Sequence, residues 1–198
     1  FEMGRHPIGY EVQKTLAAVD LFSQWAQRRG MPLPIGVAGV GEGALLAFYA
    51  AALDPRIDAT LVCGYFQPRD GLWQEPIYRN VWGLLREFGD AEIAGMVAPR
   101  RLVIEACAVP QVAGPPALRQ GRRFSAAPGE VRPIAVARVR SEFSRAQVIY
   151  KGCVAEAELR LEISGAGAGS AGSVEAMAAF GETLGIEIGP AAPAAVWQ

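Results

Sequence analysis

The sequence predicts a three-layer α/β fold, in which a mostly parallel sheet is flanked by helices. Short apolar segments of strand length alternate along the chain with longer segments whose apolar residues recur every three or four positions. Turns rich in glycine and proline separate these segments. Strands that alternate with helices in this way form a parallel sheet covered on both faces.

Each expected element follows from its own pattern of apolar residues. Helices are expected to end near residue 30 and to cover 44–53, 77–88, 134–150 and 174–184. Strands are expected at 35–38, 59–63, 101–106 and 158–164. Only the last strand alternates apolar with charged residues, so it is expected at an edge of the sheet. Residues 109–133, rich in Pro, Gly and Arg, are expected to form a long excursion.

Composition limits the classes of function. The chain has 198 residues, is 51% hydrophobic and 20% charged, and carries a formal net charge of −1, which is typical of one globular core. We expect one domain over 1–188 and a Pro/Ala-rich tail over 189–198. Without a basic run, neither nucleic acid nor a membrane is an expected partner. The start at Phe1, with no charged and apolar leader, is expected of a mature product or a piece of a longer chain.

Cysteine spacing gives no sign of a metal or redox motif. Cys63, Cys107 and Cys153 show no C-x-x-C spacing and no clustered histidines, so we expect no metal and no cofactor. Cys63 and Cys107 follow apolar strand-like runs, where a buried structural thiol is the commoner role.

The most informative motif is a glycine-rich turn between an expected strand and an expected helix. It reads Gly39-Val40-Gly41-Glu42-Gly43, where a serine hydrolase carries G-x-S-x-G. In that motif the central side chain is the nucleophile, lifted above the sheet by a strained turn. Gly41 therefore leaves the scaffold without an attacking atom.

The chain resembles the C-terminal half of an α/β-hydrolase of the acetyl xylan esterase and dienelactone hydrolase-like group, as found in large bacterial proteins. The resemblance covers about the first hundred residues. It implies that the four strands correspond to the last four of the family's eight. It rests on the turn and on the segments 4–12, 51–57, 75–80 and 98–102, which read GRHPIGYEV, AALDPRI, EPIYRN and APRRL.

The resemblance also assigns places to the catalytic triad. Gly41 stands at the nucleophile position, Ala108 or Val109 at the acid, and Gly167-Ala168 where the histidine would follow the last strand. None of these residues has a side chain that could do the chemistry. A triad works as a unit, so we expect the domain to be catalytically degenerate.

Other residues could form a rebuilt ester-hydrolysing site. Glu42 could serve as a general base, although a carboxylate in the first turn of a helix is also stabilised by the helix dipole. His6 is the single histidine, but a helix-entry role is the simpler interpretation. Glu105, on an apolar strand, could be a displaced acid or could pair with Arg100 or Arg101.

Two further classes remain open. Gly39, Gly41 and Ala44 also fit the dinucleotide fingerprint G-x-G-x-x-A, but no acidic residue ends the following strand to hold a ribose. An interaction module is the other class, because the strand at 35–38 would lose its neighbour and expose a sheet edge. A homodimer, or the remainder of a longer chain, is then the expected partner.

Any retained ligand is expected above the carboxyl ends of the strands, where ligands of parallel sheets bind. The expected ligand is a small-molecule ester or acyl compound. The residues predicted to contact it are Gly39, Gly43, Tyr65, Gly167 and Ala168.

Overall fold

The computed structural model describes residues 5–115, 120–121 and 128–187, so the predicted tail lies outside the described residues. A parallel sheet of four strands forms the middle layer, in the order β1-β2-β3-β6. The strands are β1 (Ile35–Val40), β2 (Ile57–Cys63), β3 (Arg101–Ala106) and β6 (Leu159–Ile163). The predicted α/β fold is confirmed, and β6 is an edge strand as its alternating pattern indicated.

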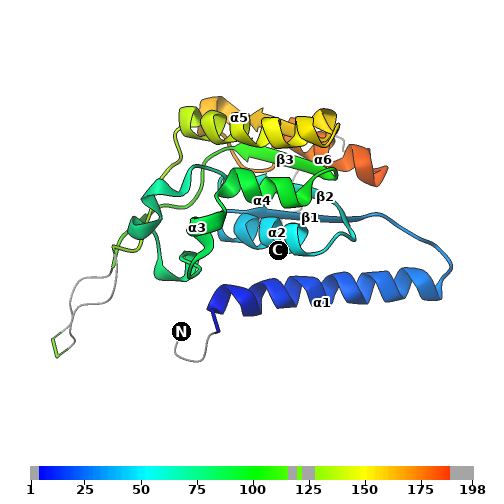
Figure 1. Cartoon of the computed structure of the whole chain (residues 1–198), viewed down its shortest axis with the longest axis horizontal. Coiled ribbons are helices and arrows are strands. Elements are labelled where there is room, and N and C mark those ends of the chain that lie inside the picture. The colour runs from blue at the N-terminus through cyan, green and yellow to red at the C-terminus, as the bar shows by residue number, and fades with distance from the viewer. Residues whose placement is uncertain (1–4, 116–119, 122–127, 188–198) are drawn as a thin grey trace, which may run out of the picture.

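Helices cover both faces of this sheet (Figure 1). The larger hydrophobic core lies under α2 (Glu42–Leu53), α4 (Asp90–Val97) and α5 (Val136–Gly152). A smaller core on the opposite face lies under α6 (Val174–Leu184). The N-terminal helix α1 (Pro7–Arg28) packs against α2.

The predicted helix over 77–88 is wrong. This region holds a 3-10 turn, η2 (Ile77–Arg79), and one short helix, α3 (Leu84–Glu87). Gly83, with φ 77°, separates them. Of the apolar residues that suggested a helical face, Ile77 and Leu85 are each 48% exposed, whereas Val81 and Leu84 are half-buried against the larger core. Residues 69–74 form another 3-10 segment, η1 (Arg69–Gln74).

Helix α4, which the apolar pattern did not indicate, supplies the helix between β2 and β3. It has only 8 residues, too few for a clear periodicity. Its start is fixed by a carboxylate cap, because the Gly89 N–H donates to Glu92 Oε2 at 2.8 Å. A second carboxylate reaches it from α5, where Glu142 Oε1 accepts from the Ala91 N–H at 2.8 Å.

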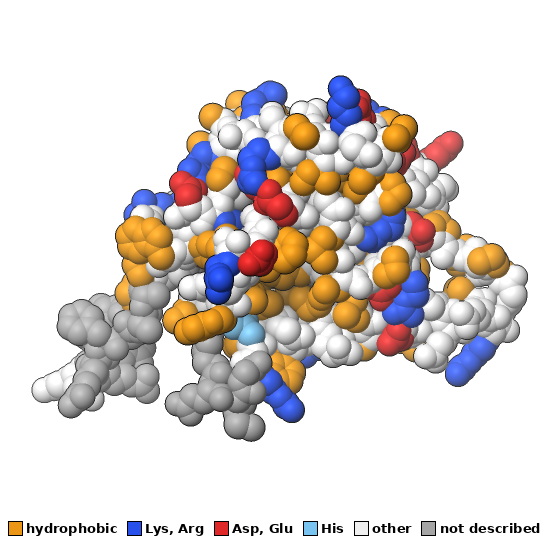
Figure 2. Space-filling view, viewed as in Figure 1, with side chains coloured by type: hydrophobic (Ala, Val, Ile, Leu, Met, Phe, Trp, Pro, Cys, Tyr) orange, Lys and Arg blue, Asp and Glu red, His pale blue; other side chains and the backbone are white. Residues whose placement is uncertain are grey.

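The predicted excursion contains a small antiparallel pair, β4 (Val112–Ala113) with β5 (Glu130–Val131). Two 3-10 turns flank β6, namely η3 (Glu156–Glu158) and η4 (Ser164–Gly167). Within the described part of the chain, no helix combines the length and the apolar character needed to cross a bilayer. On the face seen in Figure 2, positive and negative side chains are interspersed and neither sign forms one continuous patch.

Strand β1 is the second edge of the sheet. Only β2 pairs with it among the described strands, and its side chains are alternately half-buried and exposed. Val40 is 47% exposed. On α1, which lies on the same side of the domain, Phe22 and Trp25 are 59% and 43% exposed. An apolar edge of this kind favours pairing with another strand.

We expect the isolated chain to associate through β1. At high protein concentration, light scattering should give a mass above that of the monomer. Amide exchange along β1 should be slow at that concentration and faster on dilution. Ala38→Lys, a charge on the exposed edge, should shift the mass to the monomer, because edge lysines oppose strand pairing. Val148→Lys, at a site 72% exposed on α5, is the matched control. A stable monomer with rapid exchange along β1 would contradict this expectation.

Candidate functional site

The turn between β1 and α2 has the geometry of a nucleophile elbow. Gly41 has φ 55° and ψ −111°, and α2 begins at the next residue. Its N–H donates to the Cys63 carbonyl at 2.9 Å, and its carbonyl accepts from the Leu45 N–H at 3.1 Å. A Cβ added at Gly41 would meet no atom within 4 Å. The vertex therefore has room for a side chain, but its backbone is in a region that favours glycine.

The two outer glycines of the turn touch each other. A Cβ added at Gly39 would lie 2.1 Å from the carbonyl carbon and oxygen of Gly43. Since no real Cβ tolerates such a distance, the strand and the helix can approach this closely only when position 39 is glycine. At Gly43 itself an added Cβ would meet nothing within 4 Å.

The carboxylate of Glu42, the first residue of α2, is engaged in an ion pair. Its Oε1 accepts from Arg79 Nε at 2.8 Å and from the Tyr78 hydroxyl at 2.9 Å. The Arg79 side chain is only 7% exposed. Burial raises the pKa of Tyr78, and its hydrogen bond to Glu42 raises it further. A Glu42 carboxylate held in this way is a poor candidate for a free general base.

The ion pair continues inward as a chain of buried charges. Arg79 Nη1 lies 3.0 Å from Glu75 Oε2, and Glu75 Oε1 lies 3.4 Å from Arg69 Nη1. Arg69 then binds Asp90, the first residue of α4, with Nη2 2.7 Å from Oδ2. Burial raises the pKa of Asp90 even though Arg69 opposes the shift. The chain thus joins the elbow to α4.

Tyr65, one of the residues predicted to contact a ligand, lies inside this charge chain. It is 1% exposed. The guanidinium of Arg69 stacks over its ring at 3.8 Å, and that of Arg79 lies at 5.6 Å. Its hydroxyl lies 3.5 Å from that of Tyr49. Burial raises the pKa of Tyr65 well above its ordinary value.

The structure brings together the two segments that the resemblance assigned to the acid and the histidine of a triad. The Ala108 N–H donates to the Gly169 carbonyl at 2.8 Å, which joins the segment after β3 to the loop after β6. In that loop the Ala168 N–H donates to the Gly165 carbonyl at 3.0 Å. An added Cβ at Gly167, where φ is 92°, would lie 2.5 Å from Val136 Cγ2. Neither Gly167 nor Ala168 offers a titratable group.

Glu105 is buried beneath this loop, and the expectation that it pairs with Arg100 or Arg101 is wrong. Its oxygens accept from the N–H groups of Gly172 at 2.7 Å and Ser173 at 2.9 Å, at the start of α6, and from the Ser164 hydroxyl. Burial opposes ionisation, but hydrogen bonds from Cys63, Ser164 and these N–H groups outweigh it and lower the pKa of Glu105. Arg101 instead binds Glu158 and Glu182, whereas Arg100 donates to backbone carbonyls.

His6 caps the N-terminus of α1. Its Nδ1 accepts from the Ile8 N–H at 3.3 Å, and its backbone is extended as a cap residue requires. This is the helix-entry role considered above.

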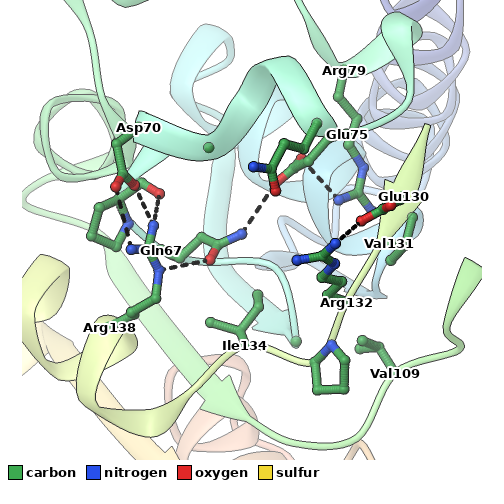
Figure 3. A pocket seen from close by; sticks show the side chains of 15 residues that line it. Gln67, Asp70, Glu75, Arg79, Val109, Glu130, Val131, Arg132, Ile134 and Arg138 are labelled. Atoms are coloured by element: carbon green, nitrogen blue, oxygen red, sulfur yellow. Dashed lines mark hydrogen bonds and ion pairs between the residues drawn. The ribbon is translucent and has the colours of Figure 1, made fainter. Parts of the chain in front are cut away.

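A polar cavity of about 340 Å³ opens beside the charge chain, at the carboxyl ends of β2 and β3 (Figure 3). Arginine–carboxylate pairs line it, and Gln67 bridges two of them by donating to Glu75 at 3.1 Å and accepting from Arg138 at 3.4 Å. Arg138 pairs with Asp70, and Arg132 pairs with Glu130.

The cavity also has an apolar wall, formed by Gly64, Val109 and Ile134. Gly39, Gly41, Gly43, Tyr65, Gly167 and Ala168 are not among its lining residues.

Apart from Val109 and Glu42, the residues that build this cavity and the charge chain were given no role from the sequence. The spacing of Glu75 and Arg79, four residues apart, was an available signal for an ion pair. The pairing of Arg69 with Asp90 joins residues too distant in sequence for such a rule. Among the described residues, no group of three or more His, Cys, Asp or Glu is arranged to hold a metal ion.

The sheet and its flanking helices define a three-layer α/β domain. Its structure is similar to that of the methylesterase BT1017, with a TM-score of 0.54 and 17% sequence identity. The similarity covers 89% of this chain and 35% of the methylesterase, so the chain spans about a third of that protein's length. No protein-family model matches the chain, and no curated protein matches it in sequence.

We expect Gly39→Ala to be severely destabilising. The added methyl group would overlap the Gly43 backbone, and overpacking of a tight core costs about 1–3 kcal/mol or more. Gly43→Ala is the matched control and should be neutral or stabilising by up to about 1 kcal/mol, because alanine is the better helix former. Urea unfolding of both variants measures the difference. Equal free energies of unfolding for the two variants would show that the backbones at positions 39 and 43 can move apart at little cost.

We expect Glu105→Gln to lose about 2–3 kcal/mol at neutral pH, because hydrogen bonds to a charged acceptor are replaced by an amide facing N–H donors. The pKa of Glu105 is lowered by folding, so its contribution is present above the unfolded-state pKa near 4.3 and is lost as the pH falls through the folded-state pKa. The gap from wild type should therefore shrink in acid. Glu182→Gln is the control, because the Glu182 side chain lies on α6 and is 58% exposed. A gap that does not change with pH would contradict the assignment.

Proposed function

We propose that this chain is an esterase-like α/β domain that has lost acyl-transfer chemistry and retains a site for a small ester or acyl ligand. The observation that carries the proposal is Gly41. It occupies the vertex of a turn with elbow geometry, φ 55° and ψ −111°, and has no side chain to attack a carbonyl.

The surroundings of the vertex support the loss of chemistry. Glu42 is held by Arg79 and Tyr78. Ala108 and the loop at Gly167-Ala168 are joined by backbone hydrogen bonds and contribute neither carboxylate nor imidazole. A hydrolase of this type needs a nucleophile activated by a base, and the described residues around Gly41 supply neither.

The cavity supports a role in binding. Its place at the carboxyl ends of parallel strands is where such sheets bind ligands. The amide groups of Gln67 and Gln74 and the guanidinium of Arg132 line it, and each can donate a hydrogen bond to a carbonyl oxygen. Val109 and Ile134 provide apolar surface for an acyl group.

The purified chain should hydrolyse small activated acetyl esters no faster than a heat-denatured sample. Gly41→Ser should not restore turnover and should not be labelled by a fluorophosphonate probe, because the new hydroxyl would have no base. That variant should still fold, since position 41 has open space and a positive φ costs serine about 1–3 kcal/mol. Gly43→Ser, with its hydroxyl off the vertex, is the matched control.

Two results would overturn the proposal. Stoichiometric labelling of Gly41→Ser, but not of Gly43→Ser, would reveal an activating base near the vertex. Saturable turnover by the wild-type chain that Glu42→Ala or His6→Ala abolishes would establish the rebuilt hydrolase instead.

A further inference from the structure

Two cysteines meet beneath the wall of the cavity. Cys63 ends β2, and Cys107 directly follows β3. Both belong to the core cluster under α6, and they are 2% and 6% exposed. Cys63 lies opposite Glu105 in the sheet register. Because side chains alternate between the faces of a strand, Cys107 lies on the same face as Glu105, one step beyond it.

The thiol of Cys107 reaches the end of the neighbouring strand. A Cβ added at Gly64, the residue after Cys63, would lie 3.4 Å from Cys107 Sγ. The positive φ of Gly64, 65°, marks where the chain turns out of β2. Cys63, Glu105 and Cys107 are therefore neighbours on one face of the sheet, the face that α6 covers.

Their proximity makes the two thiols chemically unequal. The neighbouring thiol of Cys107, burial and the charge of Glu105 all raise the pKa of Cys63. The hydrogen bond from Cys63 lowers the pKa of Cys107, against burial and the Glu105 charge. Cys107 is therefore the member that more readily becomes a thiolate, and a thiolate is the form that reacts with oxidants.

We propose that Cys63 and Cys107 form an oxidisable dithiol that closes to a disulfide when the protein meets a small peroxide. Cys107 attacks hydrogen peroxide, the O–O bond breaks, and Cys107 sulfenic acid and water form. The sulfur of Cys63 then displaces the sulfenic hydroxyl, which leaves as water with the Cys63 proton, and the S–S bond forms. The peroxide is reduced, and the two thiols are oxidised.

The disulfide would join the ends of β2 and β3 at the cavity. Gly64 and Val109, which follow the two cysteines closely in sequence, both line the cavity. A Cβ at Gly64 would lie only 2.1 Å from Val109 Cγ1, so these two wall residues are already in contact. Closing the bond would fix that part of the wall, whether or not the domain hydrolyses any ester.

The test removes the third thiol. Cys153 is exposed at the C-terminal cap of α5, so Cys153→Ser leaves a folded protein with only the buried pair. This variant is treated with dilute hydrogen peroxide under native conditions and then unfolded in a maleimide to count the remaining thiols. Peptide mapping without reductant identifies the bond. Cys63→Ser and Cys107→Ser, each made in the same background, are the single-thiol controls.

We expect the Cys153→Ser protein to lose both titratable thiols, to yield a linked pair of peptides carrying Cys63 and Cys107, and to unfold at a higher urea concentration. A dithiol reagent should reverse all three changes. With Cys63→Ser, dimedone should trap a sulfenic acid on Cys107, whereas with Cys107→Ser the remaining thiol should react much more slowly.

Retention of both thiols after native oxidation would overturn the proposal, and so would a disulfide between molecules. If a single-thiol control does not fold, the peptide map of the Cys153→Ser protein still decides the outcome. Stable sulfenic acid on Cys107 in the presence of Cys63 would also overturn it, because the second thiol would then fail to resolve the first.

Discussion

The contact between the backbones of Gly39 and Gly43 sets the position of α2, and most of the larger core depends on that position. The chain reverses from strand to helix over one residue, so α2 lies directly against the sheet and buries Ala44, Phe48 and Ala51 completely. A helix this deep is apolar nearly all round because little of it faces water. The same reversal leaves Gly41 at the carboxyl edge of the sheet, beside the end of β2.

A chain of buried charges holds the segment that lacks regular structure. Between β2 and α4 the described backbone forms short 3-10 turns and one turn of helix. Tyr65, Phe66 and Leu72 near its start are buried, whereas most apolar residues from Trp73 onward are exposed. Arg69 and Arg79 tie this segment to Glu42 on one side and to Asp90 on the other. Breaking a buried pair by removing one partner leaves an unpaired charge and costs about 3–5 kcal/mol. Ion pairs therefore help to hold this segment against α2 and α4.

The sequence predicted the elements whose signals are local. Apolar strand runs gave all four strands of the sheet, and the alternation around Leu161 placed β6 at an edge. The helix expected over 77–88 failed because apolar spacing cannot tell a buried face from an exposed one. The partners of Glu105 could not be predicted, since the N–H groups of Gly172 and Ser173 reach it only through the fold. The place of Gly41 at the vertex between β1 and α2 could be predicted because the spacing of the motif fixes it within the turn.

Glycine at the vertex preserves the elbow without the strain that a nucleophile would impose there. A residue with a side chain at φ 55° costs about 1–3 kcal/mol, whereas glycine adopts this conformation without that strain. Rebuilding a triad would meet a second obstacle in the loop after β6. A histidine at position 167 would need φ 92° and would press on Val136, whose Cγ2 lies 2.5 Å from the added Cβ. Ala168 has φ −119°, outside the left-handed region, so the backbone at position 168 does not restrict a side chain in this way.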